Sequence, residues 1–472
     1  MKNKLIIIGL AIFLIFVTYL ATYKGFSPAK DDDQHIVYKD VNKCNENDKD
    51  FCTHLPIVMI DTHNQKIPGK KRDNSTILTD ISIVDNTEGG NHINDNLKLL
   101  SKANIRYRGN SSLNFDKKGI LINLVNEDGS ENDEKVLGMP KHHEWILHGP
   151  FLDKTLIRNY MWYHIAGKIM DSAPKSKFCE LFIDGKYLGL YLMVESPSRG
   201  ENSRMPVSKY KKGKEYTSYI VRVDRGEKDK SLNLNTYTSY TNVIGTYFDL
   251  IYPAREKTNP VIKSFIEKDI SKFEKALYSY DYKSATHGYK KYINVDSFVN
   301  YYIINEFTIN YDAGSLSTYL YKDLKGKYNL YVWDFNNAND NYQEQHFDSN
   351  VFDFQNDIWF SMLMRDKDFN KQIISRYRYL RKNYLSDEYL LKYIDDVVDY
   401  LGPAINRNFE VWGYSFNMED GLLEPSTRNI HSYEEAINQL KNNILERGKF
   451  LDENIETIYQ FSHPSVIKKY TH

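Results

Sequence analysis

The chain has 472 residues, 41% of them hydrophobic, which is enough apolar material for a large folded core and excludes a largely disordered chain. Its 62 basic and 63 acidic side chains give a formal net charge of −1, which excludes recruitment of nucleic acid by overall charge. Three cysteines without CxxC spacing or a histidine pair exclude the common zinc sites.

An uninterrupted apolar segment opens the chain. Residues 5–21 read LIIIGLAIFLIFVTYLA and follow Lys2 and Lys4. A membrane-spanning helix needs about 17–25 apolar residues, whereas the core of a signal peptide has about 7–15. The segment therefore predicts a transmembrane signal anchor over 5–23, with residues 1–4 in the cytoplasm and the bulk of the chain outside the cell. Secretion after cleavage of a signal peptide is the alternative.

A polar, acidic stretch, 24–54, follows and is typical of a solvated stalk. Within it Cys44 and Cys52 are close enough for a small disulfide loop in an oxidising compartment. Cys179 lies in the apolar run FCELFI, so we expect it to be a buried hydrophobic residue.

Short runs of alternating apolar residues, bounded by Gly, Asp and Asn, characterise the region 55–259. They predict strands of a largely antiparallel sheet. The runs are 55–61, 77–85, 104–109, 119–125, 178–185 and 187–195. One helix, 154–170, is predicted among them after Asp153, a candidate N-cap.

Helical periodicity dominates the region 260–472. The predicted helices are 261–279, 296–309, 370–384, 388–401 and 433–459. A hairpin interrupts them, with strands 317–323 and 328–334 joined by the turn LKGK. The sequence thus predicts an α+β protein with a β-rich N-terminal lobe, a mainly helical C-terminal lobe and a cleft between them as the default ligand site.

Two aspartates flank the predicted hairpin. Asp312 precedes its first strand and Asp334 ends its second, so an antiparallel hairpin would bring both to its open end. Phosphoryl transfer from ATP uses one carboxylate to hold Mg²⁺ and another to orient or deprotonate the acceptor hydroxyl. The pattern predicts Asp312 as catalytic and Asp334 as a metal ligand. The alternative is that Asp312 is a turn residue before Gly314 and that Asp334 only ends a strand.

Polar residues near these aspartates can complete such a site. Protein kinases carry a metal-binding Asn five positions after the catalytic Asp, but that position is Ser317 here. Asn310 and Asn336 are the candidate oxygen ligands beside Asp334, and Ser317 is a candidate ATP contact.

A second motif resembles a phosphate cradle. After the run NIRYRG the sequence offers a glycine, hydroxyl groups and cations, which suit phosphate oxygens. The candidate ATP-binding residues are Arg108, Gly109, Asn110, Ser111, Ser112, Lys117 and Lys118. The motif is neither a Walker A loop nor GxGxxG, and a hairpin turn with solvated lysines is the alternative.

Two further charged residues are candidates for the same site. Glu195 ends an apolar strand where a carboxylate needs a cation, and Lys118 is the predicted partner, with Lys117 as the competing choice. Arg158 either contacts a phosphate or pairs with an acidic neighbour.

The ordered motifs IRYRGNSS, DKKGILINL, VLGMP, EWILHGPFLDKTLIRN, FIDGKYLGLYLMVE, NEFTINYD, STYLYKD and YVWDF resemble the CotH kinase family, whose members are spore coat protein H-like atypical protein kinases. The resemblance spans about 55–457. It implies a two-lobed kinase-like fold that uses ATP with Mg²⁺ or Mn²⁺ and phosphorylates Ser or Thr of a partner protein. By motif matching, Asp312 corresponds to the catalytic-loop Asp and Asp334 to the Asp of the WDxD segment.

The chain departs from the family pattern just after Asp334. Family members typically continue as WDFD or WDLD and then Gly, whereas this chain reads WDFNNAND. Asn336 therefore replaces an acid, which reduces the negative charge available to bind a metal ion. Asp340 is the next acid, but its spacing from Asp334 is different.

Three functions remain as candidates. The first is an active Ser/Thr kinase of a surface or coat protein, and the second is a weak or inactive pseudokinase that serves as a surface binding or assembly protein. The third is a kinase whose acceptor is a sugar or polymer.

Overall fold

The computed structural model describes residues 44, 51–69, 75–86, 89–201, 203–226, 233–241 and 247–462. All of them belong to one compact unit, Asp32–His472. The predicted anchor, 5–23, lies outside the described residues. No helix within the described ranges combines the length and apolar character that a membrane span requires.

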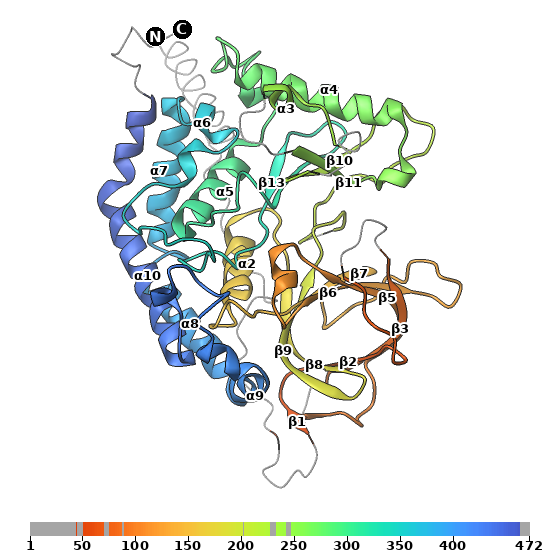
Figure 1. Ribbon diagram of the computed structural model, residues 1–472. Helices are drawn as coiled ribbons and strands as arrows, with labels where there is room; N and C mark the ends of the chain where they lie inside the picture. Colours follow the sequence, from red (N-terminus) through yellow and green to blue (C-terminus); the bar gives the residue numbers. More distant parts are fainter. Residues whose placement is uncertain are drawn as a thin grey trace, which may run out of the picture. The chain divides into compact units, whose positions relative to one another are not determined.

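Seven strands close into a barrel, drawn in red to yellow in Figure 1. Neighbouring strands are antiparallel except β2 and β8, which are parallel, so the predicted largely antiparallel sheet is closed on itself. Alternate side chains such as Ile81, Ala103 and Ile122 fill its interior. In barrel order the strands are β2 (Ile57–Asp61), β3 (Ile77–Val84), β5 (Leu99–Arg108), β6 (Gly119–Val125), β7 (Glu144–His148), β9 (Lys186–Glu195) and β8 (Ser176–Ile183).

A small two-stranded sheet pairs β1 (Cys52–Thr53) with β4 (Asn91–His92). The disulfide between Cys44 and Cys52 is present and packs against Gly90, where an added Cβ would lie 2.5 Å from the Cys52 sulfur. Strand β1 lies within the range predicted as stalk, so regular structure begins before residue 55. Cys179 is buried, as expected.

The predicted hairpin is part of a four-stranded antiparallel sheet ordered β11 (Tyr247–Tyr252), β10 (Tyr219–Asp224), β12 (Thr318–Lys322), β13 (Asn329–Tyr331). Leu320 pairs with Leu330 across the hairpin, and Val221 of β10 pairs with Leu320. Strands β10 and β11 were not predicted, and the pairing of β10 with β12 joins the chain on both sides of residue 259.

The helix predicted at 154–170 is α2 (Arg158–Ile169) and begins four residues later than expected. The carboxylate of Asp153 accounts for the delay. Its Oδ1 accepts a hydrogen bond from the backbone N of Thr155, which forms a turn, and its Oδ2 accepts one from the backbone N of Arg158. Asp153 thus supports the start of the helix without being its N-cap.

The five helices predicted after residue 260 are present with shifts of a few residues at their ends. In α4 the side chain of Asn259 accepts from the backbone N of Ile262, and Pro260 occupies the first turn. The α-helices after α2 are α3 (Tyr237–Thr241), α4 (Pro260–Leu277), α5 (Val295–Thr308), α6 (Phe360–Leu363), α7 (Lys367–Arg381), α8 (Asp387–Leu401), α9 (Pro403–Trp412) and α10 (Tyr433–Asn454). Short 3₁₀ turns are η2 (Ser111–Asn114), η4 (Arg255–Lys257), η5 (Tyr289–Lys291), η6 (Phe354–Asn356), η7 (Gly413–Asn417), η8 (Ser426–Arg428) and η9 (Ile455–Ser462).

Helix α9, which the sequence did not predict, packs against the barrel strand β9. Its Asn408 accepts hydrogen bonds at Oδ1 from Lys117 (2.6 Å) and from the backbone N of Leu190 (3.2 Å). Arg407 forms an ion pair with the fully buried Glu180. These contacts fix the barrel against α9.

Candidate functional site

A cleft of about 670 Å³ lies between the barrel, the four-stranded sheet and the segment 312–344. Residues from strands β5, β6 and β7 line one side, and residues from β10, β11 and β12 line another. The cleft brings together most of the predicted site, namely Arg108, Gly109, Asn110, Ser111, Ser112, Asp312, Ser317, Asp334 and Asn336.

The two aspartates reach the cleft through the ends of regular elements. Helix α5 ends at Thr308, and the left-handed Ile309 (φ 45°) turns the chain toward Asp312. Asp334 follows β13 and has a φ of 61°, a conformation that is strained for a non-glycine residue. The structure therefore confirms the expected convergence of both side chains at the open end of the hairpin.

Electrostatics distinguish the two carboxyl groups. Burial raises the pKa of Asp312 to about 6, and the nearby charge of Asp334 adds to this increase. Burial also raises the pKa of Asp334, while Arg108 and hydrogen bonds from Asn336 oppose that increase. The charges of Asp334 and Asp224 disfavour the ionisation of Asp312, and the charge of Asp224 disfavours that of Asp334, so a nearby cation would stabilise both ionised carboxylates.

Asparagine amides position these carboxylates. Asn337 donates from Nδ2 to Oδ2 of Asp312 over 2.9 Å, and Asn336 donates from Nδ2 to Oδ1 of Asp334 over 2.8 Å. Asn159 of α2 donates to Oδ1 of Asn336 over 3.2 Å. Because the Asn336 amide donates to Asp334, its side chain supports that carboxylate in addition to offering an oxygen of its own.

Helix α2 also holds the backbone after β13. Oδ1 of Asn159 accepts from the backbone N of Phe335 (2.7 Å), and the hydroxyl of Tyr163 accepts from the backbone N of Asp334 (3.1 Å). Both α2 residues line the cleft. Neither residue was predicted as part of the site, although Asn159 lies beside the predicted Arg158 in the motif LIRN.

The RGNSS loop forms a compact turn at the cleft. Gly109 has a φ of 126°, and an added Cβ would lie 1.9 Å from Oγ of Ser112, so only glycine fits here. Nζ of Lys118 donates to the backbone oxygens of Leu113 (3.0 Å) and Phe115 (2.5 Å). Lys118 thus closes the loop and does not line the cleft.

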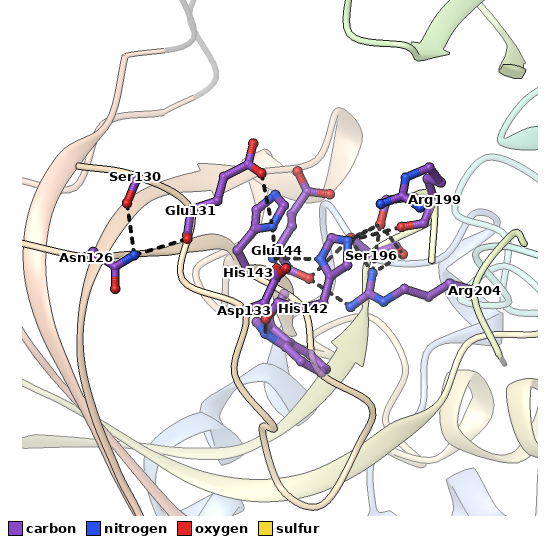
Figure 2. Close-up of polar contacts among 12 residues, drawn as sticks. Asn126, Ser130, Glu131, Asp133, His142, His143, Glu144, Ser196, Arg199 and Arg204 are labelled. Atoms are coloured by element: carbon purple, nitrogen blue, oxygen red, sulfur yellow. Dashed lines mark hydrogen bonds and ion pairs between the residues drawn. The ribbon is translucent and has the colours of Figure 1, made fainter. Parts of the chain in front are cut away.

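The predicted ion pair between Lys118 and Glu195 is wrong. Glu195 is fully buried, its Oε1 lies 3.6 Å from Nε of Arg204, and its Oε2 accepts from the backbone N of Lys175 over 3.0 Å. Figure 2 shows how Arg204 is held there, by donation to the backbone oxygens of Ser196 and Glu144. Glu195 is therefore a structural residue outside the cleft.

Lys117, the competing partner, is also excluded from the site. It is 1% exposed, and its ammonium group donates to Asn408 of α9 and lies over the ring of Tyr191. Burial lowers its pKa well below the usual range, and Lys154 contributes to the decrease. Its role is to join the barrel to α9.

Arg158 and Asn310 do not line the cleft either. Arg158 is 2% exposed and pairs with Asp153 at 2.5 Å, so its acidic-neighbour interpretation is confirmed. Asn310 is 1% exposed, and its Nδ2 donates to Oδ1 of Asn305 over 3.1 Å. The Oδ1 of Asn310 is buried without a hydrogen-bond partner among the described residues, so its role as a metal ligand stays a prediction, although the residue does not line the cleft.

The sheet side of the cleft carries charged residues that the sequence analysis missed. Arg222 lies 3.2 Å from Asp224 and 2.7 Å from Asp249, and Arg255 lies 3.3 Å from Asp249. Tyr342 from the segment after Asp334 lines the cleft as well. The signal that was missed is the alternating run YIVRVD, which forms β10.

Asp312 and Asp334 offer the oxygen ligands that a divalent cation prefers, but they supply only part of a ligand set. The described residues contain no cluster of three or more His, Cys, Asp or Glu side chains that could hold a metal. Asp312 and Asp334 provide two carboxylates, and a hard cation such as Mg²⁺ commonly takes its remaining ligands from water and substrate phosphates.

One comparison with known proteins identifies the family. A family model described as CotH kinase protein matches residues 105–451, which is more than half of the chain and includes every cleft-lining residue predicted above. The chain therefore belongs to the CotH kinase family. A search of curated proteins finds no match.

Proposed function

Taking membership of the CotH kinase family as the premise, we propose that this protein is an atypical protein kinase that transfers the γ-phosphate of ATP to Ser or Thr side chains of a surface or coat protein. The proposed fold is a kinase-like pair of lobes, with the barrel as part of the N-terminal lobe. The observation that carries the proposal is the convergence of Asp312 and Asp334 in one cleft with the RGNSS loop.

In the proposed reaction Asp312 accepts the proton of the acceptor hydroxyl. The hydroxyl oxygen forms a bond to the γ-phosphorus, and the bond from that phosphorus to the β,γ-bridging oxygen breaks, which releases ADP. Asn337 keeps the Asp312 carboxylate oriented through its 2.9 Å hydrogen bond. Asp334, with Asn336 beside it, would hold Mg²⁺ or Mn²⁺, which neutralises charge on the phosphates when bound.

Radiolabel transfer from ATP with Mg²⁺ or Mn²⁺ tests this proposal, with a mixture of candidate surface proteins as acceptors. Wild-type protein should label a protein acceptor at Ser or Thr, and Asp334→Ala and Asp312→Ala should lose the label. Lys102→Met is the control, because Lys102 pairs with Asp80 at 2.7 Å and does not line the cleft. Equal labelling by wild type and Asp334→Ala would exclude this catalytic role. Label found on sugar or polymer would favour the other acceptor class.

A pseudokinase that acts as a surface binding or assembly protein is the second candidate, because Asn336 stands where the family usually has an acid. Nucleotide-induced stabilisation separates the two, since a ligand that binds only the folded state raises its melting temperature. A shift with ATP and Mg²⁺ supports the kinase. No shift, together with no transfer, supports the binding protein.

We further propose that the protein is attached to the cell membrane by residues 5–23 and faces outward, with no role for nucleic acid. The disulfide between Cys44 and Cys52 supports an oxidising compartment. Protease treatment of intact cells tests the orientation, because an outward-facing unit is digested and a cytoplasmic one is protected. Release of soluble protein into the medium would favour cleavage of a signal peptide instead.

A further inference from the structure

Two arginines share one face of strand β5 at the cleft. Arg106 and Arg108 both line the cleft, whereas Ile105 and Tyr107 belong to the barrel core, as the alternation of a strand requires. Arg106 was not selected by the sequence analysis. The structure thus places a second cation beside the one that begins the RGNSS loop.

Neither guanidinium group is neutralised by a described carboxylate at ion-pair distance. Arg106 donates only to the backbone oxygen of Tyr107 over 3.3 Å, and Arg108 lies over the ring of Trp333, 5.6 Å from its centroid. Arg222, on the opposite side of the same cleft, is paired with Asp224 and Asp249. Among the described residues, Arg106 and Arg108 thus lack the kind of carboxylate partner that Arg222 has across the cleft.

The two arginines also act on each other. Burial lowers the pKa of Arg106, Arg108 lowers it further, and the charge of Glu144 opposes the decrease. The neighbouring His148, at the end of β7, has a pKa lowered to about 4 mainly by burial, with Asp153 opposing and Arg108 contributing to the decrease. Its buried Nε2 has no hydrogen-bond partner among the described residues. A neutral imidazole here can donate to an oxygen without adding charge.

Like charges held together at a partly buried site are unfavourable unless a counter-ion binds there. The unpaired cations of β5 share the cleft with the carboxylates of Asp312 and Asp334. A ligand with a polyanionic chain and a cation bound at one end could bind both sets of residues. Its anionic groups would pair with the arginines, and its cation would pair with the carboxylates. The phosphate chain of a nucleoside triphosphate with its metal has this distribution of charge.

We propose that Arg106 and Arg108 together form an anion subsite for the phosphate chain of the nucleotide, with Arg106 as a phosphate-contacting residue in its own right. The identity of the ligand as ATP rests on the proposed kinase function. The subsite itself rests on the placement of the two arginines. Planar guanidinium groups bind phosphate oxygens in pairs, which favours this ligand over a monovalent anion.

Calorimetric titration of the full chain with ATP and Mg²⁺, and separately with inorganic tripolyphosphate, tests the subsite. Arg106→Met should weaken the binding of both ligands about tenfold, as expected for loss of a charged hydrogen bond. Arg106→Lys should recover part of the affinity. Without ligand, Arg106→Met should melt at the wild-type temperature or slightly above it, because a repulsive contact with Arg108 is removed; a purely structural role would lower that temperature.

Lys102→Met is the matched control. Lys102 lies four residues before Arg106 on the same face of β5, but it pairs with Asp80 and does not line the cleft. The variant removes the same charge and should bind both ligands as wild type does.

The outcomes separate the subsite from the kinase function. Equal affinity of wild type and Arg106→Met for both ligands overturns the subsite and leaves kinase function in place. Binding of tripolyphosphate but not ATP, weakened by Arg106→Met, supports the subsite and argues against a kinase. If wild type binds neither ligand, both proposals fail.

Discussion

Nδ2 of Asn336 donates a hydrogen bond to Oδ1 of Asp334 over 2.8 Å, so the residue that replaces an acid of the family pattern supports the neighbouring carboxylate. An aspartate at this position would face Asp334 with a second negative charge. The substitution therefore lowers repulsion in the metal-free protein and weakens the field that attracts a cation.

Restoring the acid should reverse both effects. In Asn336→Asp the binding of Mg²⁺ should tighten on the order of tenfold because one more charged oxygen ligand is available. Without metal the variant should melt at a lower temperature than wild type, because it loses the 2.8 Å donor and gains repulsion from Asp334. Metal titration and thermal denaturation, each with EDTA controls, measure this.

Asn350→Asp is the control for that change. Asn350 is exposed and lies outside the cleft, so the same change in charge should leave Mg²⁺ affinity as in wild type. Unchanged affinity in Asn336→Asp would contradict a role for residue 336 in the strength of metal binding.

The pKa of Asp312, raised to about 6, predicts a pH dependence of phosphoryl transfer. A proton acceptor must be ionised, so the rate should fall about tenfold for each pH unit below 6 and level off above it. Bound metal supplies an opposite charge and should move the midpoint to a lower pH. Initial rates between pH 4.5 and 8 measure it, and a flat profile would remove Asp312 from the role of base.

Lys117 provides a test of the corrected site. Because its ammonium group is buried against Asn408 and Tyr191, away from the cleft, Lys117→Met should bind ATP as tightly as wild type. Asn408 keeps its second donor, the backbone N of Leu190, so no oxygen is left unpaired. Arg108→Met should lose affinity in the same titration. A loss of affinity in both variants would restore the original prediction for Lys117.

Asp357 should make stability depend on pH. Burial raises its pKa from 3.8 to about 8, and the hydrogen bond from Ser315 partly opposes the increase. The folded state then holds this proton more tightly than the unfolded state does. The stability that this bound proton contributes to the folded state is fully present below a pH of about 3.8 and is lost as the pH rises to about 8.

The variant Asp357→Asn keeps the acceptor oxygen for Ser315 and removes the titration. It should be more stable than wild type at pH 8 and similar to it at pH 4, with each unit of raised pKa corresponding to about 1.4 kcal/mol. Thermal denaturation at the two pH values compares them. An equal difference between the proteins at both values would show that this carboxyl group does not titrate between them.

Local patterns predicted those parts of the site that regular elements position directly. The alternation of apolar residues in 317–323 and 328–334 identified the hairpin, and antiparallel pairing then required Asp312 and Asp334 to converge. Gly109 was identified because few other residues allow a close turn before a strand. In these cases the spacing of residues along a regular element determines directly which side chains lie close together.

Side-chain direction beyond the local element could not be read in the same way. Lys117 and Lys118 are adjacent, yet one reaches Asn408 of α9 and the other closes its own loop. Glu195 is paired with Arg204, which lies in an irregular segment without a periodic signal. Such partners depend on packing between segments that are distant in sequence.

Pairing of β10 with β12 has a consequence for how the protein can be dissected. Val221 and Leu320 are partners in the sheet that carries the hairpin, although a boundary between lobes was predicted at residue 259. A fragment ending there would hold β10 and β11 with an unpaired edge, which favours aggregation. During synthesis the four-stranded sheet cannot form before β12 has been made, so the hairpin of β12 and β13 folds together with the first half of the chain.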